Sequence, residues 1–364
     1  MGSNGHKHIL IAPLDWGLGH TTRCVPIIRQ LLSGGHSVTF AGNEWQRSYI
    51  TKTFGGIETI HLEGYNVTYG KKGSGFLFSM VYQMPRLVRT IRKEHEWLKN
   101  LTQQRQFDGI ISDNRYGLFH NKIPSVMMTH QLQVQSGMGE AVDHLIRKMH
   151  YKYIQRFRSC WVVDVEEVPN LSGKLAHPGT VPKNAQYVGL LSQIAGEAEL
   201  KSLDAHLLVL LSGPEPQRSI LSAILWEQVK EYKGRVVFVE GSTYAEQPPN
   251  IPPHLEYHQQ VTSRELLPLM QQAWIVVCRS GYSTLMDLVA LNKKAILIPT
   301  PGQTEQEYLG KHLHKEGVYY SVSQKRLNLE QALQDIKLFP FRPVELKEGH
   351  KQYVKVVEQW VKSL

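Results

Sequence analysis

The most informative stretch of this sequence is Cys278-Arg279-Ser280-Gly281-Tyr282-Ser283-Thr284-Leu285-Met286-Asp287, which lies between the apolar runs Trp274–Val277 and Ala295–Ile298. This order predicts a strand, a tight turn at Ser280-Gly281, a helix and a second strand. A helix that begins at a Ser-Gly turn presents unpaired backbone N–H groups and the positive end of its dipole, and such a helix start binds phosphate. Asp287 follows one helical turn later and could accept a hydrogen bond from a ribose hydroxyl. The stretch therefore predicts a nucleotide site.

Length and composition favour a globular protein of two domains. The chain has 364 residues, of which 41% are hydrophobic and 20% charged, so it is too long for one typical domain. No apolar run approaches the ~20 residues that span a bilayer, and no secretory signal is expected. The three cysteines, Cys24, Cys160 and Cys278, are too scattered for a disulfide framework or a zinc site. We therefore expect a cytoplasmic protein.

The net charge of +9 indicates an anionic partner, which could be nucleic acid, anionic lipid or a phosphorylated ligand. Nucleic acid is not expected, because no nucleic-acid-binding motif accompanies the charge and the basic residues are dispersed. A nucleoside diphosphate, together with an anionic membrane surface, explains the charge better.

Apolar segments with the length of strands alternate with helical stretches, which predicts parallel sheets with helices on both faces. The predicted strands of the first half are His8–Ala12, Ser37–Ala41, Ile57–Leu62, Gly109–Ser112, Ser125–Met128 and Cys160–Val163, with a helix at Thr22–Leu32. After a predicted linker at Val188–Ser202 the pattern restarts with strands His206–Leu211 and Arg235–Glu240 around the helix Arg218–Glu231. We expect two doubly wound α/β domains that face a cleft, residues 1–187 and 188–345, and a C-terminal segment 346–364 that contains a helix, Lys347–Val361.

The loop after the first strand carries a candidate general base. It contains Gly17-Leu18-Gly19-His20, whose glycines permit a tight turn and a close backbone approach to phosphate. The loop is not a full dinucleotide fingerprint, because Thr22 stands at the third glycine position. His20 at a helix start suits proton transfer near neutral pH; the alternative is a turn with a capping histidine.

Two further side chains follow neighbouring strands. Asp113 ends one strand and could orient His20, although a carboxylate that caps the next segment is an equal alternative. His130 ends the next strand and is a candidate to contact the acceptor substrate or the diphosphate of a nucleotide. The alternative is that it caps a helix. No Asp-x-Asp pair ends a strand, so we expect no metal.

Several side chains of the second half could contact a nucleotide sugar. Ser212-Gly213 offers a second phosphate-binding helix start, and Arg218 could reach the diphosphate or the base. A polar loop running into a helix can hydrogen-bond sugar hydroxyls; the alternative is a solvated helix start. The predicted nucleotide contacts are Gly17, Gly19, Ser212, Gly213, Arg218, Arg279, Ser280, Gly281, Ser283, Thr284 and Asp287, and the predicted sugar contacts are Gln303, Gln306 and Glu307.

The segment from Trp274 to about Leu313 resembles the C-terminal half of inverting UDP-sugar glycosyltransferases with the two-domain GT-B fold. It is most similar to the peptidoglycan transferases that add N-acetylglucosamine to a lipid-linked acceptor. The matching residues are Val276-Val277-Cys278-Arg279-Ser280-Gly281, Thr284, Pro299 and Gln306. The family has Glu where Asp287 stands, and a second Gln where Glu307 stands.

The resemblance implies a donor site on the second domain, an acceptor site on the first, and a C-terminal helix that crosses back to the first domain. In the family the Glu at position 287 holds the ribose, the two Gln side chains hold the sugar, and the backbone at Thr262-Ser263 brackets the base. From the sequence alone Thr262 would be an ordinary helix N-cap. The Gly-x-Gly-His loop resembles both this family and GT-B nucleotide-sugar hydrolases, in which the histidine is catalytic.

Residues 75–93 combine apolar and basic side chains, with Pro85 expected to kink the helix. An apolar face rimmed by Arg86, Arg89, Arg92 and Lys93 could bind anionic lipid, or its apolar side could face the core.

We therefore expect a metal-independent inverting glycosyltransferase without a cofactor, in which His20 activates a glycan or lipid-linked acceptor. It would work in the cytoplasm, on the inner face of the membrane where it binds lipid. The alternatives are a GT-B nucleotide-sugar hydrolase or epimerase, and a non-catalytic nucleotide-sugar binding protein.

Overall fold

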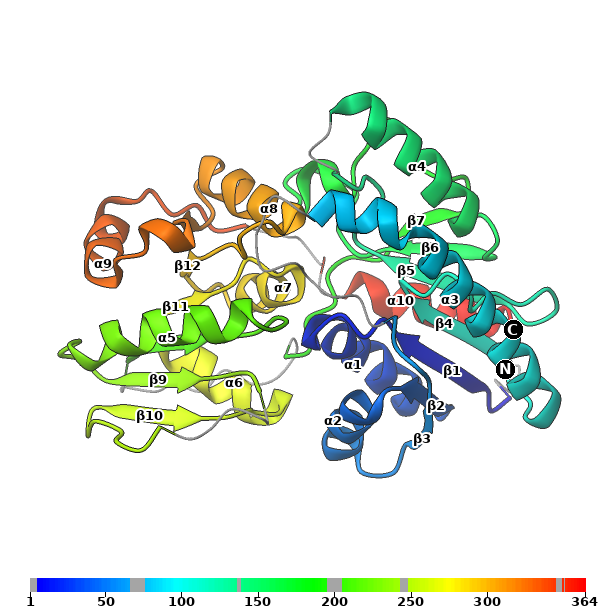
Figure 1. Cartoon of the computed structure of the whole chain (residues 1–364). Helices are drawn as coiled ribbons and strands as arrows, with labels where there is room; N and C mark the ends of the chain where they lie inside the picture. Colours follow the sequence, from blue (N-terminus) through cyan, green and yellow to red (C-terminus); the bar gives the residue numbers. More distant parts are fainter. Residues whose placement is uncertain are drawn as a thin grey trace.

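The computed structural model describes residues 5–65, 76–135, 139–194, 205–242, 248–344, 349 and 351–364; the side chains of residues 76–85 lie outside this description. Within these residues, two parallel sheets form two α/β domains that lie side by side (Figure 1). The strands are β1 (His8–Pro13), β2 (Ser37–Gly42), β3 (Glu58–His61), β4 (Gly109–Asp113), β5 (Ser125–Thr129), β6 (Ser159–Val162), β7 (Ala185–Tyr187), β8 (His206–Leu210), β9 (Val236–Val239), β10 (Leu255–His258), β11 (Ala273–Cys278), β12 (Ala295–Leu297) and β13 (Tyr320–Ser321).

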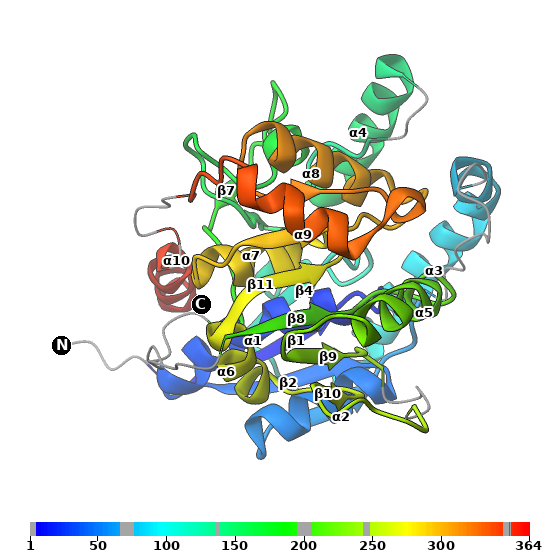
Figure 2. The ribbon, with the colours of Figure 1, turned by 90° about the vertical axis from the view of Figure 1, so that its left-hand side faces the viewer.

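Helices cover both faces of each sheet (Figure 2). They are α1 (Leu18–Ser33), α2 (Glu44–Phe54), α3 (Phe76–Gln104), α4 (Glu140–Ile154), α5 (Gln217–Lys230), α6 (Ser263–Gln272), α7 (Tyr282–Ala290), α8 (Thr304–Lys315), α9 (Leu329–Leu338) and α10 (Gln352–Lys362), with short 3₁₀ turns at η2 (Gly173–Leu175) and η3 (Gln324–Arg326). The predicted two-domain α/β architecture is confirmed.

The strand order places the loops that carry function. Among the described residues the first sheet has the order β3-β2-β1-β4-β5-β6-β7 and the second has β10-β9-β8-β11-β12-β13, with every pair parallel. In each sheet the order of strands changes direction at one place. This switch point lies between β1 and β4 in the first sheet and between β8 and β11 in the second. Ligands bind in the crevice at the carboxyl ends of strands at such switch points. The two reversal points therefore place the loops after β1, β4, β8 and β11 in the region where a ligand is expected.

The predicted strands are all present, and three short edge strands were missed. β7, β10 and β13 lie at the edges of their sheets and have no continuous apolar run, so the sequence pattern does not distinguish them from loops. The first helix begins at Leu18 rather than at Thr22 as predicted, because Gly17 at φ 75° turns the chain directly into it. His20 therefore lies within the first turn of α1.

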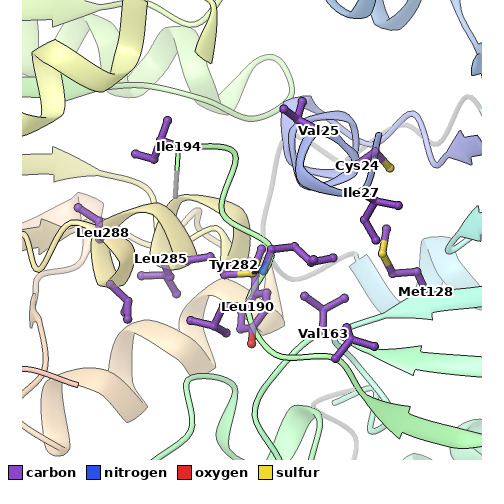
Figure 3. Close-up of a cluster of buried hydrophobic side chains, with 14 of the residues drawn as sticks. Cys24, Val25, Ile27, Met128, Val163, Leu190, Ile194, Tyr282, Leu285 and Leu288 are labelled. Carbon is purple, nitrogen blue, oxygen red and sulfur yellow. Dashed lines mark hydrogen bonds between the residues drawn. The ribbon is translucent and has the colours of Figure 1, made fainter. Parts of the chain in front are cut away.

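The predicted linker is not an exposed connection where the structure describes it. Residues 188–194 are buried and pack between α1 of the first domain and α7 of the second (Figure 3). Leu190 and Ile194 supply apolar side chains that are at most 1% exposed, which explains why this stretch enters the core. The two domains thus share one continuous hydrophobic core.

The C-terminal helix returns to the first domain, as the resemblance implied. α10 packs on α1, and the ring of Trp360 meets that of Trp161 on β6 edge-on, with centroids 5.5 Å apart. α10 begins at Gln352, and Lys347, where the predicted helix began, lies outside the described residues.

Candidate active site

A cleft opens between the two domains, and it gathers most of the predicted site residues. Its walls are the loop after β1 with the start of α1, the ends of β5 and β8, and the starts of α7 and α8. The predicted residues that line it are Gly17, Gly19, His20, His130, Ser212, Gly213, Gly281, Ser283, Thr284, Asp287, Gln303 and Gln306. Candidate residues from both halves of the sequence therefore face one cleft.

His20 and Asp113 form the predicted pair. His20 Nδ1 lies 3.1 Å from Asp113 Oδ2, and the Asp113 side chain is fully buried at the end of β4. Burial alone would raise the pKa of Asp113, but Arg23 and His20 lower it to about 2. Burial lowers the pKa of His20, with Asp113 opposing that shift. The pair is therefore a carboxylate beside a largely neutral imidazole near neutral pH.

Arg23, one turn after His20, joins the pair and was not predicted. Its Nε lies 2.6 Å from Asp113 Oδ2, Nη2 donates to Asp113 Oδ1, and Nη2 also lies 2.9 Å from His20 Nδ1. The arginine side chain is 1% exposed. A signal existed in its spacing, because side chains three apart share one helix face.

The tautomer of His20 decides what it can do. With a proton on Nδ1, His20 donates to Asp113 and keeps a lone pair on Nε2, so it can act as a base. If Nδ1 instead accepts from Arg23, the proton lies on Nε2, which can then donate a hydrogen bond but cannot remove a proton. His20 Nδ1 thus faces both a hydrogen-bond acceptor, Asp113, and a hydrogen-bond donor, Arg23, and each favours a different tautomer.

His130 connects this cluster to the second domain. Arg23 Nη1 lies 2.6 Å from His130 Nδ1, and since a guanidinium can only donate, that nitrogen accepts. The proton of His130 then lies on Nε2, which is 2.9 Å from Glu305 Oε1 at the start of α8. The ring of Tyr282, on α7, stacks on His130 with centroids 4.4 Å apart. Glu305 also lines the cleft and was not predicted.

The starts of α1 and α7 meet where the phosphate site was predicted. Ser283 Oγ on α7 donates to the carbonyl oxygen of Gly19 at 2.8 Å. A Cβ atom at Gly19 would lie 2.9 Å from Ser283 Oγ, so glycine is required for this approach of the domains. Gly213 has φ +107° and turns the chain after β8, where only glycine is at ease.

The turn at Ser280 holds Gln306, the predicted sugar contact, in place. Ser280 Oγ donates to the carbonyl of Gln306 at 2.8 Å. The Gln306 side-chain oxygen accepts from the backbone N–H and hydroxyl of Thr300, at 3.0 and 2.9 Å. Gln306 is thereby held at the cleft wall, and no described residue accepts a hydrogen bond from its amide NH₂ group.

Asp287 lines the cleft but is already engaged by residues 192–193. Its carboxylate accepts from Ser192 Oγ at 2.7 Å, from Gln193 N at 3.2 Å and from Gln193 Nε2 at 2.9 Å. Burial raises the pKa of Asp287 to about 6, and the hydrogen bonds from Gln193 and Ser192 oppose that rise. Its ribose contact stays a prediction.

Two predicted nucleotide-binding arginines are not brought to the cleft. Arg218 forms a buried ion pair with Glu240 and a second pair with Glu215, whose side chain is exposed. Arg279 is 1% exposed and donates to the carbonyls of Ile298, Pro299 and Gln217. Both guanidinium groups are used within the second domain, so this structure offers no support for their predicted contact with the diphosphate.

Three further predicted contacts are not among the residues that line the cleft, and each bonds to other protein groups. Thr262 caps α6 in a capping box with Glu265, which is the alternative weighed for it. Ser263 Oγ is buried against Gln193 at 3.0 Å. Glu307 accepts from the backbone N–H of Gly302 at 2.8 Å and lies on the exposed side of the α8 start.

Comparison with known proteins gives the same architecture. The glycotransferase of kitacinnamycin superimposes with a TM-score of 0.67 at 15% identity, covering 99% of this chain and 100% of that one. MurG of Acinetobacter baumannii superimposes with a TM-score of 0.51 at 12% identity, over 97% and 95%. The protein therefore has the fold of GT-B glycosyltransferases.

Sequence matches show which glycosyltransferases this chain resembles. Residues 207–359 match the model of the glycosyltransferase family 28 C-terminal domain. An uncharacterized glycosyltransferase of Methanosarcina acetivorans is 23% identical over 82% of this chain and 79% of its own length. The UDP-N-acetylglucosamine–N-acetylmuramyl-(pentapeptide) pyrophosphoryl-undecaprenol N-acetylglucosamine transferase of Histophilus somni is 30% identical, over 44% of this chain and 49% of its own length. The chain is a glycosyltransferase, and the similarity to the family 28 C-terminal domain covers residues 207–359.

Proposed function

We propose that the protein is a metal-independent, inverting hexosyltransferase that moves N-acetylglucosamine or a related hexose from a UDP-sugar to a glycan or lipid-linked acceptor. One observation carries this proposal: the His20–Asp113 pair stands at a cleft that the loop after β8 and the start of α7 also line. The name of the Histophilus somni relative supports the donor, because that enzyme uses UDP-N-acetylglucosamine.

The proposed reaction is a single displacement. His20 Nε2 removes the proton of an acceptor hydroxyl, whose oxygen attacks the anomeric carbon of the donor sugar. The bond from that carbon to UDP breaks, and the configuration inverts. The imidazolium that forms is balanced by the Asp113 carboxylate, and backbone N–H groups near Gly213 and Ser283 stabilise the departing diphosphate.

The experiment that tests this function is a thermal-shift screen of nucleoside diphosphates and their sugars. UDP and one UDP-sugar should stabilise the protein by ~2.7 kcal/mol at 100 times their Kd, and other nucleotides should do so less. UDP release that needs no added acceptor would favour the hydrolase or epimerase alternative. Binding without turnover on any acceptor would favour a binding protein. Activity that EDTA abolishes and a divalent ion restores would refute metal independence.

Asp287→Ala should weaken UDP binding without loss of the fold. A hydrogen bond to a charged group contributes ~1.5–3 kcal/mol, so Kd should rise about tenfold or more. Isothermal titration calorimetry with UDP measures this change, and Asp335→Ala, in α9 and not among the residues that line the cleft, is a control that should leave Kd unchanged. Unaltered UDP affinity in Asp287→Ala would remove the ribose contact from the proposal.

We further propose that the first domain binds an anionic membrane surface. Arg86, Arg89, Arg92 and Lys93 are exposed on α3, whereas Ile91 faces the core. On α4, Leu145 is 60% exposed and Met149 40% exposed. Figures 1 and 2 show α3 and α4 projecting from the same end of the first domain. Residues 75–85 of the predicted membrane stretch lie outside the described side chains. Among the helices described, none is long and apolar enough to cross a membrane.

Co-sedimentation with vesicles tests this membrane surface. The protein should pellet with anionic but not neutral vesicles, and less so at high salt. Because each basic side chain contributes ~1 kcal/mol, Arg86→Glu/Arg89→Glu should weaken binding at least ~30-fold. Lys315→Glu/Lys337→Glu, with the same charge change on the second domain, should have little effect. Negligible pelleting with every vesicle would contradict the proposal.

A further inference from the structure

One buried side chain joins both domains to the carboxylate that we assign to the ribose. Gln193 is 6% exposed and lines the cleft. Its Nε2 donates to Asp287 Oδ2 at 2.9 Å. Its Oε1 accepts from Tyr49 OH at 2.9 Å and from Ser263 Oγ at 3.0 Å. Gln193 therefore bonds α2 of the first domain and both α6 and α7 of the second.

The directions of these hydrogen bonds fix the amide. A carboxylate can only accept, so the amide NH₂ group must face Asp287, and the carbonyl oxygen must face the two hydroxyls. The hydroxyls of Tyr49 and Ser263 also lie 2.9 Å from each other, which closes a ring of contacts around the amide oxygen. Such a side chain has little rotational freedom, and it holds Asp287 in one orientation.

The hydrogen bonds leave Asp287 with capacity for a ligand. Among the described residues, Oδ1 accepts from Ser192 Oγ and Gln193 N, whereas Oδ2 accepts only from Gln193 Nε2. Each carboxylate oxygen can accept two hydrogen bonds, so Oδ2 retains one lone pair. A ribose hydroxyl in the cleft is a donor of the kind that this lone pair can accept.

We propose that Gln193 is a positioning residue of the nucleotide site: it holds the Asp287 carboxylate in the orientation that binds the ribose, and through Tyr49 it ties that orientation to the first domain. The inference rests on the proposed function, because it assumes that Asp287 binds a nucleotide. It extends that function by making the donor site depend on contacts from both domains.

The proposed role of Gln193 predicts a change in the ionisation of Asp287. The pKa of Asp287, which burial raises to about 6, is held down by the hydrogen bonds from Gln193 and Ser192. Tyr49 faces the same network, and burial raises its pKa to about 12, so it stays neutral. Glu265, at the start of α6, has a lowered pKa through its bonds to Thr262 and stays charged. Loss of the Gln193 donor should therefore let Asp287 take up a proton nearer neutral pH.

The test is UDP affinity, measured by calorimetry at about pH 7 and about pH 8.5, above the usual carboxyl range. Gln193→Met should weaken UDP about tenfold at the lower pH, the loss typical of one hydrogen bond to a charged group. At the higher pH Asp287 ionises again, and the loss should shrink to roughly threefold. Tyr49→Phe keeps the bond to Asp287 but frees the amide, and should weaken UDP roughly twofold to threefold.

A matched control comes from α2. Gln46 is also buried and donates to Leu14 O and Thr21 Oγ1, both at 3.0 Å, but has no bond to Asp287. Gln46→Met should lower the melting temperature and leave UDP affinity unchanged at both pH values.

The outcomes separate the two ideas. Wild-type affinity in Gln193→Met, or the same loss at both pH values, would overturn the positioning role. If Asp287→Ala binds UDP normally, the ribose assignment itself fails, whatever Gln193 does. If Gln193→Met does not fold, Tyr49→Phe decides the matter, and unchanged affinity in that variant overturns the inference.

Discussion

His20→Ala is expected to lower kcat by ~10²–10⁴, the usual contribution of general-base catalysis, with little change in UDP affinity. The reason is geometric: His20 lies on the first domain, held by Asp113 at 3.1 Å, whereas most of the predicted nucleotide contacts lie on the second. Steady-state kinetics with the UDP-sugar found by the thermal-shift screen measures kcat, and calorimetry measures binding. A variant that keeps more than about a tenth of the wild-type kcat would show that His20 is not the base.

The pH profile adds a second readout. The base must be unprotonated, and burial lowers the pKa of His20 below its ordinary value. The acidic limb of kcat should therefore lie below the pH at which an ordinary histidine titrates. Asp113→Asn removes the carboxylate that raises this pKa, so the limb should shift further toward acid, while kcat falls less than in His20→Ala. A limb that does not move would separate Asp113 from the catalytic base.

The core of the fold could be predicted because parallel strands are buried on both faces. Runs such as Ile9–Ala12 and Gly109–Ile111 contain no polar side chain, and they form the central strands β1 and β4. The edge strand β7 carries no such run, because an edge needs little burial. Residues 188–194 were interpreted as part of a linker. Their burial was not predictable, because an apolar segment between domains has no periodic pattern that indicates which surface will cover it.

The site was predictable where backbone geometry decides it. The loop around Gly19-His20 follows a strand and opens a helix, so its position at the cleft follows from the fold. Arginine side chains were not predictable in the same way. Arg218 and Arg279 were expected to bind phosphate, but they bind carboxylates and carbonyls within their own domain. A guanidinium recognises both kinds of oxygen equally well, and the sequence does not say which one the fold brings near.

Arg23 shows the same limit from the other side. It stands in the apolar pattern of α1, and nothing local indicates that its charge is buried against Asp113, which follows 90 residues later. Such an ion pair forms only when β4 pairs beside β1. The spacing places Arg23 on the same helix face as His20, but its burial against Asp113 is visible only in the tertiary structure.

Arg23→Met is expected to destabilise the protein by ~3–5 kcal/mol, because it leaves the buried Asp113 carboxylate without its cation. Equilibrium urea denaturation at neutral pH measures the loss as a fall in the transition midpoint. Arg23→Met/Asp113→Asn should recover part of this stability, since the double variant no longer buries an unpaired charge. Arg235→Met, which breaks the exposed pair with Glu256, is the control and should cost less than ~1 kcal/mol.

The pH dependence of this stability follows from the same pair. The folded pKa of Asp113 is about 2, below its ordinary 3.8, so the unfolded chain takes up the proton first as the pH falls. The stability from the pair is fully present above the unfolded value and is lost as the pH falls through the folded value. In Arg23→Met the pKa of Asp113 should rise, because burial then acts without the cation. The wild type should therefore lose more stability than Arg23→Met between about pH 4 and about pH 2, because carboxyls such as Glu58 and Glu265, whose pKa values are also lowered, titrate in both proteins. If the two proteins lose equal stability over this range, the ion pair does not set the charge of Asp113, and the proposed orientation of His20 loses its support.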